Sequence, residues 1–205
     1  GGKLEMLPMD FAACLLSKKA GGLPVKICYN REEEFSFSRR KHAMHYKVKT
    51  GVTKDGIITA MTGEVIADGG AYCSYGPTVM AAAIMRIFMV YKLQHFRING
   101  YRIYTNTPIS GAMRGFGGVQ SGFAIESHMD LIANHLGIDP IEFRLRNITT
   151  PNMVTVNKMF LTTNGLKECI ERAAVASEWT KKRGNKDYYK AGISRRGIGI
   201  GIAAD

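Results

Sequence analysis

The sequence predicts an α+β domain with a mixed sheet, an antiparallel hairpin and packed helices. Segments with apolar residues at helical spacing alternate along the chain with segments in which apolar and polar residues alternate. Two of the alternating segments, 44–50 and 57–68, are joined by the turn sequence Lys54-Asp55-Gly56 and are expected to form the hairpin. With 205 residues, 45% of them hydrophobic, the chain can bury a sizeable core.

The first half is expected to contain two helices and two further strands besides the hairpin. Residues 9–19 form an amphipathic pattern that ends at Gly21-Gly22, and the apolar segment 80–90 is typical of a buried helix. Residues 24–29 and 96–107 alternate as strands do, the second with a break near Asn99-Gly100. The glycines at 69 and 70 are expected to end the second hairpin strand.

The clearest predicted helix runs from Val119 to Leu136. Its apolar stripe consists of Phe123, Ile125, Met129, Ile132 and Leu136, and Glu126, Asp130 and Asn134 lie opposite. Gly137 should end it, and Asp139, Pro140 and Glu142 have the spacing of a capping box for a next helix.

In the C-terminal part, the sequence pattern changes from a helical segment to a basic segment and then to an alternating one. Residues 149–163 look irregular, a last helix starts at Asn164, 181–196 is polar and basic, and 197–202 alternates like a strand. We therefore expect a domain over 1–178, a basic linker over 179–196, and in 197–205 the first strand of a following domain. The chain is expected to be a piece of a larger protein.

Composition excludes several classes of protein. No apolar run reaches the roughly 20 residues of a membrane span, and no signal peptide opens the chain. The four cysteines lack metal-ligand spacing and are expected to be reduced and buried in a cytoplasmic protein. The net charge of +11 admits nucleic-acid binding, but no zinc knuckle, helix-turn-helix or aromatic platform accompanies the basic clusters.

The most informative segment is Ala112-Met113-Arg114-Gly115-Phe116-Gly117-Gly118, directly before the predicted helix. Glycine accepts positive φ, so successive N–H groups can converge on an anion, and a helix N-terminus adds its own unpaired donors. The alternative is a tight strand-to-helix turn, with Arg114 in an ion pair and Phe116 as a core anchor. The segment lacks the lysine and hydroxyl of a nucleotide-binding P-loop.

The spacing of the histidines along the sequence does not indicate a metal site. His42 and His45 are three residues apart, which places them on opposite faces of a strand. His128 and His135 share a predicted helix and are expected to be surface or hydrogen-bonded side chains.

The glycine-rich segment does not stand alone. Together with Phe123-Ala124-Ile125-Glu126, 136–147, Arg31-Glu32-Glu33-Glu34-Phe35 and Lys41-His42-Ala43-Met44-His45, it resembles the molybdenum-binding subunit of the xanthine dehydrogenase and aldehyde oxidase family of molybdenum hydroxylases. Gly1-Gly2-Lys3 resembles the end of that family's first glycine-rich loop. The resemblance runs from residue 1 to about Arg172, in the family's order.

The resemblance implies a cofactor, molybdenum held by molybdopterin or by its cytosine dinucleotide form. Arg114 matches the residue whose main chain lies against the metal's oxygen ligand, and Phe116 the aromatic that stacks on a flat substrate. Gly115, Gly117 and Gly118 would keep the loop thin, and Gly1 and Gly2 would belong to the opposing loop. It also implies iron–sulfur and FAD partners in a dimer of heterotrimers. The family's catalytic glutamate lies outside this chain, so no catalytic residue is assigned and the piece alone should be inactive.

Departures from the family pattern concern the substrate. Leu4 replaces a glutamate and Lys41 an arginine of purine-oxidising members, and both positions are candidate substrate contacts. Gly115 stands where carbon monoxide-oxidising members place a copper-binding cysteine. An aromatic acid, its thioester or an N-heterocycle remains open. The rival hypotheses are a basic nucleic-acid-binding module and a non-catalytic interaction domain.

Overall fold

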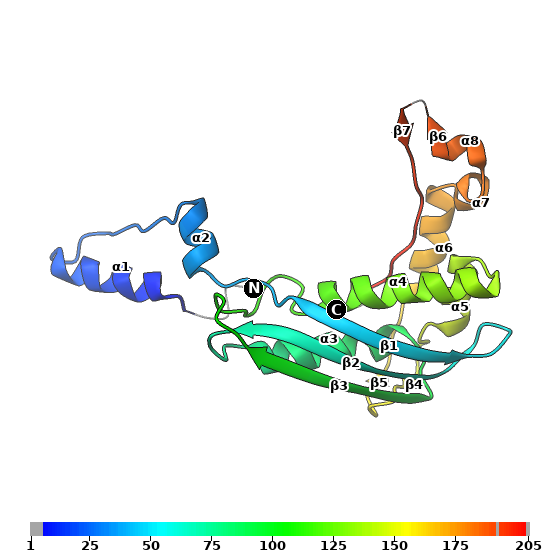
Figure 1. Cartoon of the computed structure of the whole chain (residues 1–205), viewed down its shortest axis with the longest axis horizontal. Helices are drawn as coiled ribbons and strands as arrows, with labels where there is room; N and C mark the ends of the chain where they lie inside the picture. The colour runs from blue at the N-terminus through cyan, green and yellow to red at the C-terminus, as the bar shows by residue number, and fades with distance from the viewer. Residues whose placement is uncertain (1–5, 192, 204–205) are drawn as a thin grey trace. The chain divides into compact units, whose positions relative to one another are not determined.

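The computed structural model describes residues 6–191 and 193–203. Figure 1 shows the order of its elements by colour and label. In chain order they are α1 (Pro8–Lys19), α2 (Arg31–Phe37), β1 (Met44–Val52), β2 (Ile58–Gly70), α3 (Gly76–Val90), β3 (His95–Tyr104), α4 (Gly118–Leu136), α5 (Pro140–Asn147), β4 (Met153–Val154), β5 (Phe160–Leu161), α6 (Leu166–Ala176), α7 (Trp179–Lys182), α8 (Lys186–Tyr189), β6 (Lys190–Ala191) and β7 (Ser194–Arg195).

The main sheet has three strands in the order β1-β2-β3. A short turn joins β1 to β2, where Thr53 N donates to Ile57 O at 2.9 Å. The arrows of β2 and β3 point the same way, and α3 connects these two strands (Figure 1). Their C-terminal ends meet, because Thr105 N donates to Gly70 O at 3.1 Å. The predicted mixed sheet with an antiparallel hairpin is confirmed.

The chain folds into two compact units. The first contains the N-terminal residues through Lys47, together with Glu64–Ile84 and Asn99–Gln120. The second contains Val48–Gly63, Met85–Ile98 and the residues from Ser121 onward. The glycine-rich segment before α4 therefore belongs to the first unit.

The second unit has an apolar core contributed by its sheet and helices. Its buried members are Ile58, Met61, Ile87, Phe88, Val90, Tyr91, Leu93, Ile125, Met129, Ala133 and Phe143. A smaller cluster surrounds Trp179, which is 5% exposed and donates from Nε1 to Asp139 at 2.9 Å.

Helix α4 confirms the predicted element and most of its predicted apolar stripe, since Ile132 and Leu136 also pack on the core. Its buried residues include Ile125, Met129 and Ala133, whereas Phe123 is 80% exposed. The Glu126 carboxylate is not directed only to solvent, because it accepts hydrogen bonds from Tyr91 and Arg144. Glu126, predicted to lie opposite the apolar stripe, is thus paired with an arginine that has no exposed surface.

The junction between α4 and α5 follows the sequence signals closely. Gly137 has φ +69°, and Ile138 N donates to Ala133 O, which ends α4. The Asp139 carboxylate accepts from Ile141 N at 2.8 Å and so caps α5. The reciprocal half of the capping box is absent, since the Glu142 carboxylate binds Arg146.

The N-terminal part differs from prediction in two respects. Residues 24–29 form no strand: their side chains alternate in burial, but no strand among the described residues pairs with them. Helix α1 has the predicted position, yet Phe11 is 56% and Leu15 62% exposed. Helix α2 begins after Asn30, whose side chain accepts from Glu33 N, and its acidic first turn is solvent-exposed or half-exposed.

The C-terminal part contains more regular structure than predicted up to residue 195 and less after it. β4 and β5 form a small hairpin within 149–163, with Met153 opposite Leu161. The segment 181–196, expected to be a linker, contains α8 and the β6–β7 hairpin. Residues 197–202, predicted as the first strand of a following domain, pair with no strand in the part of the chain that the structure describes, and the following domain stays a prediction. Their burial alternates, and Ile202 N donates to Glu126 at 3.0 Å.

Three further findings complete the comparison. β3 is continuous through Asn99-Gly100, and a Cβ on Gly100 would lie 2.9 Å from Met80 Cγ, so this glycine admits α3 rather than breaking the strand. The four cysteines are free, but all are exposed rather than buried. Within 6–191 and 193–203, no helix is long and apolar enough to cross a membrane.

Candidate functional site

The glycine-rich segment forms a tight loop that leads into α4. Gly115, Phe116 and Gly117 have φ values of +86°, +41° and +92°. Two internal bonds close the loop: Phe116 N donates to Met113 O at 2.8 Å, and Gly118 N donates to Gly115 O at 2.6 Å. A positive φ at phenylalanine is strained, and such strain persists where the surroundings impose it, often at functional sites.

Four consecutive amides before this turn are unpaired within the described chain. The backbone N–H groups of Ala112, Met113, Arg114 and Gly115 have no acceptor in the part of the chain that the structure describes. Ala112 is only 1% exposed, and an unpaired buried N–H is costly. Consecutive backbone donors beside a left-handed turn are an arrangement that binds anions. The loop therefore fits the anionic end of a cofactor.

One side of the loop is pressed against α3. A Cβ on Gly117 would lie 2.5 Å from Val79 O and 2.9 Å from Ala83 Cβ, so only glycine fits there. Arg114 and Gly115 are exposed, and Phe116 is half-buried. The loop thus packs on α3 at Gly117 and is exposed to solvent at Arg114.

The segment Arg40-Lys41 supports the loop from a second direction. Arg40 pairs with the loop through its backbone: Arg40 N donates to Ile109 O, and Gly111 N donates to Arg40 O, each at 3.1 Å. The next side chain reaches further along the loop, where Lys41 Nζ donates to Arg114 O at 2.6 Å.

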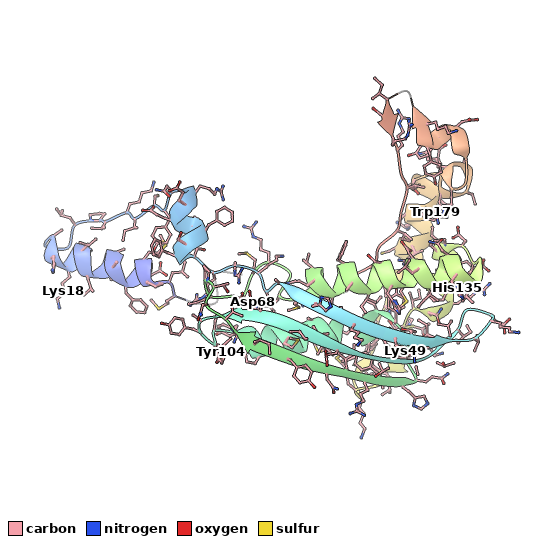
Figure 2. The ribbon with its side chains drawn as sticks, viewed as in Figure 1. Lys18, Lys49, Asp68, Tyr104, His135 and Trp179 are labelled. Carbon is pink, nitrogen blue, oxygen red and sulfur yellow. The ribbon has the colours of Figure 1, made fainter. Side chains whose placement is uncertain are left out.

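The carboxylate of Asp68 binds the side chain of Arg40. Asp68, labelled near the end of β2 in Figure 2, binds the Arg40 guanidinium and accepts from Thr105 Oγ1 at 2.5 Å. The hydrogen bond from Thr105, with that from Gly70 N and the charge of Arg40, lowers the pKa of Asp68 below its usual value. Arg40 also donates to Thr107 Oγ1 at 2.5 Å. This network joins three segments that are distant in sequence.

His42 is buried next to a second arginine. Arg102 Nε donates to His42 Nε2 at 3.3 Å. Burial, and next the charge of Arg102, lower the pKa of His42, so the imidazole is neutral with its proton on Nδ1. The Nδ1 atom, Ser110 Oγ and Gln120 Oε1 are buried without a partner among the described residues. Gln120 Nε2 donates to His42 O at 3.1 Å, which links the start of α4 to this segment.

The structure brings together part of the predicted site. Arg114, Gly115, Phe116, Gly117 and Gly118 share one loop, and Lys41 touches it. Gly1, Gly2 and Leu4 lie outside the described residues. The guanidinium of Arg114 has no partner within those residues, so the ion pair considered from sequence is not formed there.

Sequence reasoning missed Arg40, Asp68 and Arg102. Asp68 is the last residue of the predicted strand 57–68, and Arg40 lies outside the predicted helices and strands. Their side-chain partners are 28 or more residues away along the chain, so no local spacing could have found them.

A shallow groove of about 600 Å³ lies in the second unit. Lys49, labelled in Figure 2, lines it with Ala60, Thr62, His95 and Arg97. Its charged side chains are basic. It contains none of the loop residues, so it is separate from the candidate site.

The chain matches the molybdopterin cofactor-binding domain family over residues 1–148. It is 36% identical over 203 residues to the xanthine dehydrogenase molybdenum-binding subunit of Escherichia coli O157:H7, covering 98% of this chain and 26% of that protein. It is 38% identical over 176 residues to the nicotinate dehydrogenase large molybdopterin subunit of Eubacterium barkeri, covering 84% and 40%.

Solved structures agree with this match. The aldehyde oxidoreductase of Desulfovibrio gigas superposes with a TM-score of 0.79 at 25% identity, covering 92% of this chain and 20% of that one. Quinoline 2-oxidoreductase from Pseudomonas putida 86 gives a TM-score of 0.73 at 26% identity, covering 88% and 24%. The chain therefore spans about a quarter of the length of several of these similar proteins.

Proposed function

Because the chain belongs to the molybdopterin cofactor-binding domain family, we propose that its glycine-rich loop seats the cofactor of a molybdenum hydroxylase. The whole protein then oxidises a carbon of an aromatic or N-heterocyclic substrate. When bound, the cofactor supplies a metal centre that takes two electrons from the substrate while oxygen derived from water is added.

The single observation that carries this proposal is the row of unpaired amides from Ala112 to Gly115. These donors point to an anionic group, and the exposed side of the loop at Arg114 gives such a group access. We assign the amides of Arg114 and Gly115 to the metal-bearing end of the cofactor. Gly117 and Gly118 keep the loop close to α3, and Gly1 and Gly2 are assigned to the opposing loop.

Phe116 is assigned to the substrate. Its ring belongs to a residue with φ +41°, so the loop holds it in a conformation that phenylalanine rarely adopts. A fixed aromatic ring favours flat substrates by stacking. The names of two similar proteins, a nicotinate dehydrogenase and a quinoline 2-oxidoreductase, indicate the same class of N-heterocycles.

The finer features of the whole protein are part of the same proposal. Leu4 replaces a glutamate of purine-oxidising members, which disfavours xanthine itself. Lys41 replaces an arginine of those members, at a position whose ammonium binds the Arg114 carbonyl. The substrate is then an N-heterocycle or an aromatic acid. Electrons leave through iron–sulfur and FAD partners in a cytoplasmic dimer of heterotrimers, and the cofactor has either the plain or the cytosine dinucleotide form.

Metal and pterin analysis of the full-length protein tests this function directly. We expect one molybdenum and one pterin per chain, and acid release of CMP would identify the dinucleotide form. Reduction of an artificial electron acceptor is then followed over a panel of N-heterocycles and aromatic acids. Phe116→Ala should abolish turnover, and Arg97→Ala, an exposed residue of β3, is the control. A purified protein without molybdenum or pterin contradicts the proposal.

A further inference from the structure

We infer that Lys41 is a positioning residue that fixes the direction of the Arg114–Gly115 peptide in the glycine-rich loop. Its contact is the 2.6 Å hydrogen bond from Nζ to Arg114 O. A bond from an ammonium to a carbonyl is charge-assisted and stronger than one between neutral groups. The functional consequence rests on the proposed function, because it concerns the loop that is assigned to the cofactor.

The contact determines where one of the free amides points. The Arg114–Gly115 peptide is trans, so its C=O and N–H groups point in opposite directions. Since Lys41 holds the carbonyl oxygen, the Gly115 N–H faces away from Lys41. That N–H is one of the donors without an acceptor in the described chain. Lys41 therefore presents a donor to the ligand without contacting the ligand itself.

The residues on either side of Lys41 hold it in place. Arg40 pairs with Ile109 and Gly111 through its backbone and binds Asp68 through its side chain. His42 is 2% exposed and is fixed by Arg102. A lysine between two such anchors has little freedom of backbone position, so the ammonium is delivered to the loop by the fold.

Two backbone hydrogen bonds close the loop next to the Arg114 carbonyl. Its two closing bonds come from Phe116 N and Gly118 N, and the strained φ of Phe116 opposes them. Lys41 adds a side-chain bond to this turn, from its Nζ to Arg114 O. Loss of this bond should loosen the turn and increase opening at both closing bonds.

Hydrogen exchange of the full-length protein, expressed without molybdate, tests the inference. Lys41→Met should increase exchange at the Phe116 and Gly118 amides about fivefold, as expected for one lost hydrogen bond. Lys41→Arg keeps a long cationic donor and should stay within about twofold of the wild type. Lys47→Met is the matched control, because Lys47 is exposed on β1 and has no partner in the described chain.

Molybdenum and pterin content is the second readout, measured on protein expressed with molybdate. Lys41→Met should lower both, while Lys41→Arg and Lys47→Met retain them. With any substrate found in the panel, Lys41→Met should lower kcat with KM nearly unchanged. A raised KM at unchanged kcat would identify Lys41 as a substrate contact and overturn the inference.

The exchange data separate this inference from the proposed function. If Lys41→Met exchanges as the wild type does, Lys41 does not position the loop, whatever the cofactor content. If the wild type holds no molybdenum or pterin, the proposed function fails, and faster exchange in Lys41→Met still establishes the contact with Arg114.

Discussion

The guanidinium of Arg102 occupies the space in which a side chain on Gly76 would begin. A Cβ built on Gly76 would overlap Nε and Cδ of Arg102. The arginine cannot move aside freely, because its Nη2 donates to Gly69 O at 2.7 Å and Tyr72 O at 2.6 Å. Arg102, on β3, thus holds the segment between β2 and α3. Gly69 and Gly76 leave space for its side chain, since a Cβ on either would overlap it.

Gly76→Ala is therefore expected to destabilise the chain. Overpacking of this kind costs about 1–3 kcal/mol in the free energy of unfolding. Urea denaturation followed by circular dichroism measures it. The control is Gly122→Ala in α4, where a Cβ meets nothing within 4 Å. That substitution should instead stabilise by about 0.5–1 kcal/mol, because alanine has the better helix propensity.

A double-mutant cycle shows whether the clash with Arg102 causes the loss of stability in Gly76→Ala. If the clash with Arg102 is responsible, Arg102→Ala should make Gly76→Ala nearly neutral, so that the two effects do not add. Additive effects would assign the cost of Gly76→Ala to some other contact.

Gly117→Ala tests the packing of the glycine-rich loop on α3. Alanine there would meet Val79 O at 2.5 Å in addition to the unfavourable φ of +92°. Gly137 has φ +69° with nothing within 4 Å, so Gly137→Ala measures the φ cost alone, about 1 kcal/mol. We expect Gly117→Ala to cost at least about 1 kcal/mol more than this control. Equal losses in urea denaturation would mean that the loop does not press on α3.

Arg144 should be the most sensitive position in the second unit. Its side chain has no exposed surface, and it binds Glu126 at 2.8 Å and Asp130 at 2.7 Å. Arg144→Met leaves the Glu126 carboxylate, which is 13% exposed, without its cation. Breaking a buried pair in this way costs about 3–5 kcal/mol.

The fluorescence of Trp179 measures this loss during urea denaturation, since it is the chain's single tryptophan and lies buried in the same unit. Arg172→Met is the control: its pair with Glu168 is 81% and 66% exposed and should change stability by no more than about 0.5 kcal/mol. A similar effect of both substitutions would contradict the special role of the buried arginine.

Much of the fold could be predicted because its signals are local. The Lys54-Asp55-Gly56 turn, the glycine after α4 and the Asp139 cap each depend on residues a few positions apart. The loop at 112–118 could be recognised for the same reason.

The remainder depends on contacts that are distant in sequence. Glu126 looked like a solvent-facing residue, and only the position of Arg144 turns it inward. Residues 197–202 have the alternation of a strand, but burial alternates there because Ile198, Ile200 and Ile202 pack against the cluster around Trp179 within the second unit. They have no partner strand among the described residues. The support of the loop by Arg40, Lys41 and Asp68 likewise exists only in three dimensions.

The unfolding free energy of the chain should fall as the pH decreases below about 6.5, the ordinary pKa of histidine. Burial lowers the pKa of both His42 and His128 in the folded state. Between the folded and unfolded pKa values the unfolded chain binds more protons, so acid favours unfolding. The stability that these neutral histidines contribute is complete above pH 6.5 and is lost as the pH falls through their folded pKa values.

His42→Gln should flatten this dependence, because glutamine keeps an acceptor for Arg102 Nε and does not titrate. The urea midpoint between pH 8 and pH 5.5 measures the slope. His45→Gln is the control, since His45 is exposed on β1. His128→Gln should remove a separate part of the slope, because His128 bonds Thr50 Oγ1 at 2.9 Å within the second unit. If His42→Gln leaves the slope unchanged while His45→Gln reduces it, the neutral state of His42 beside Arg102 is wrong.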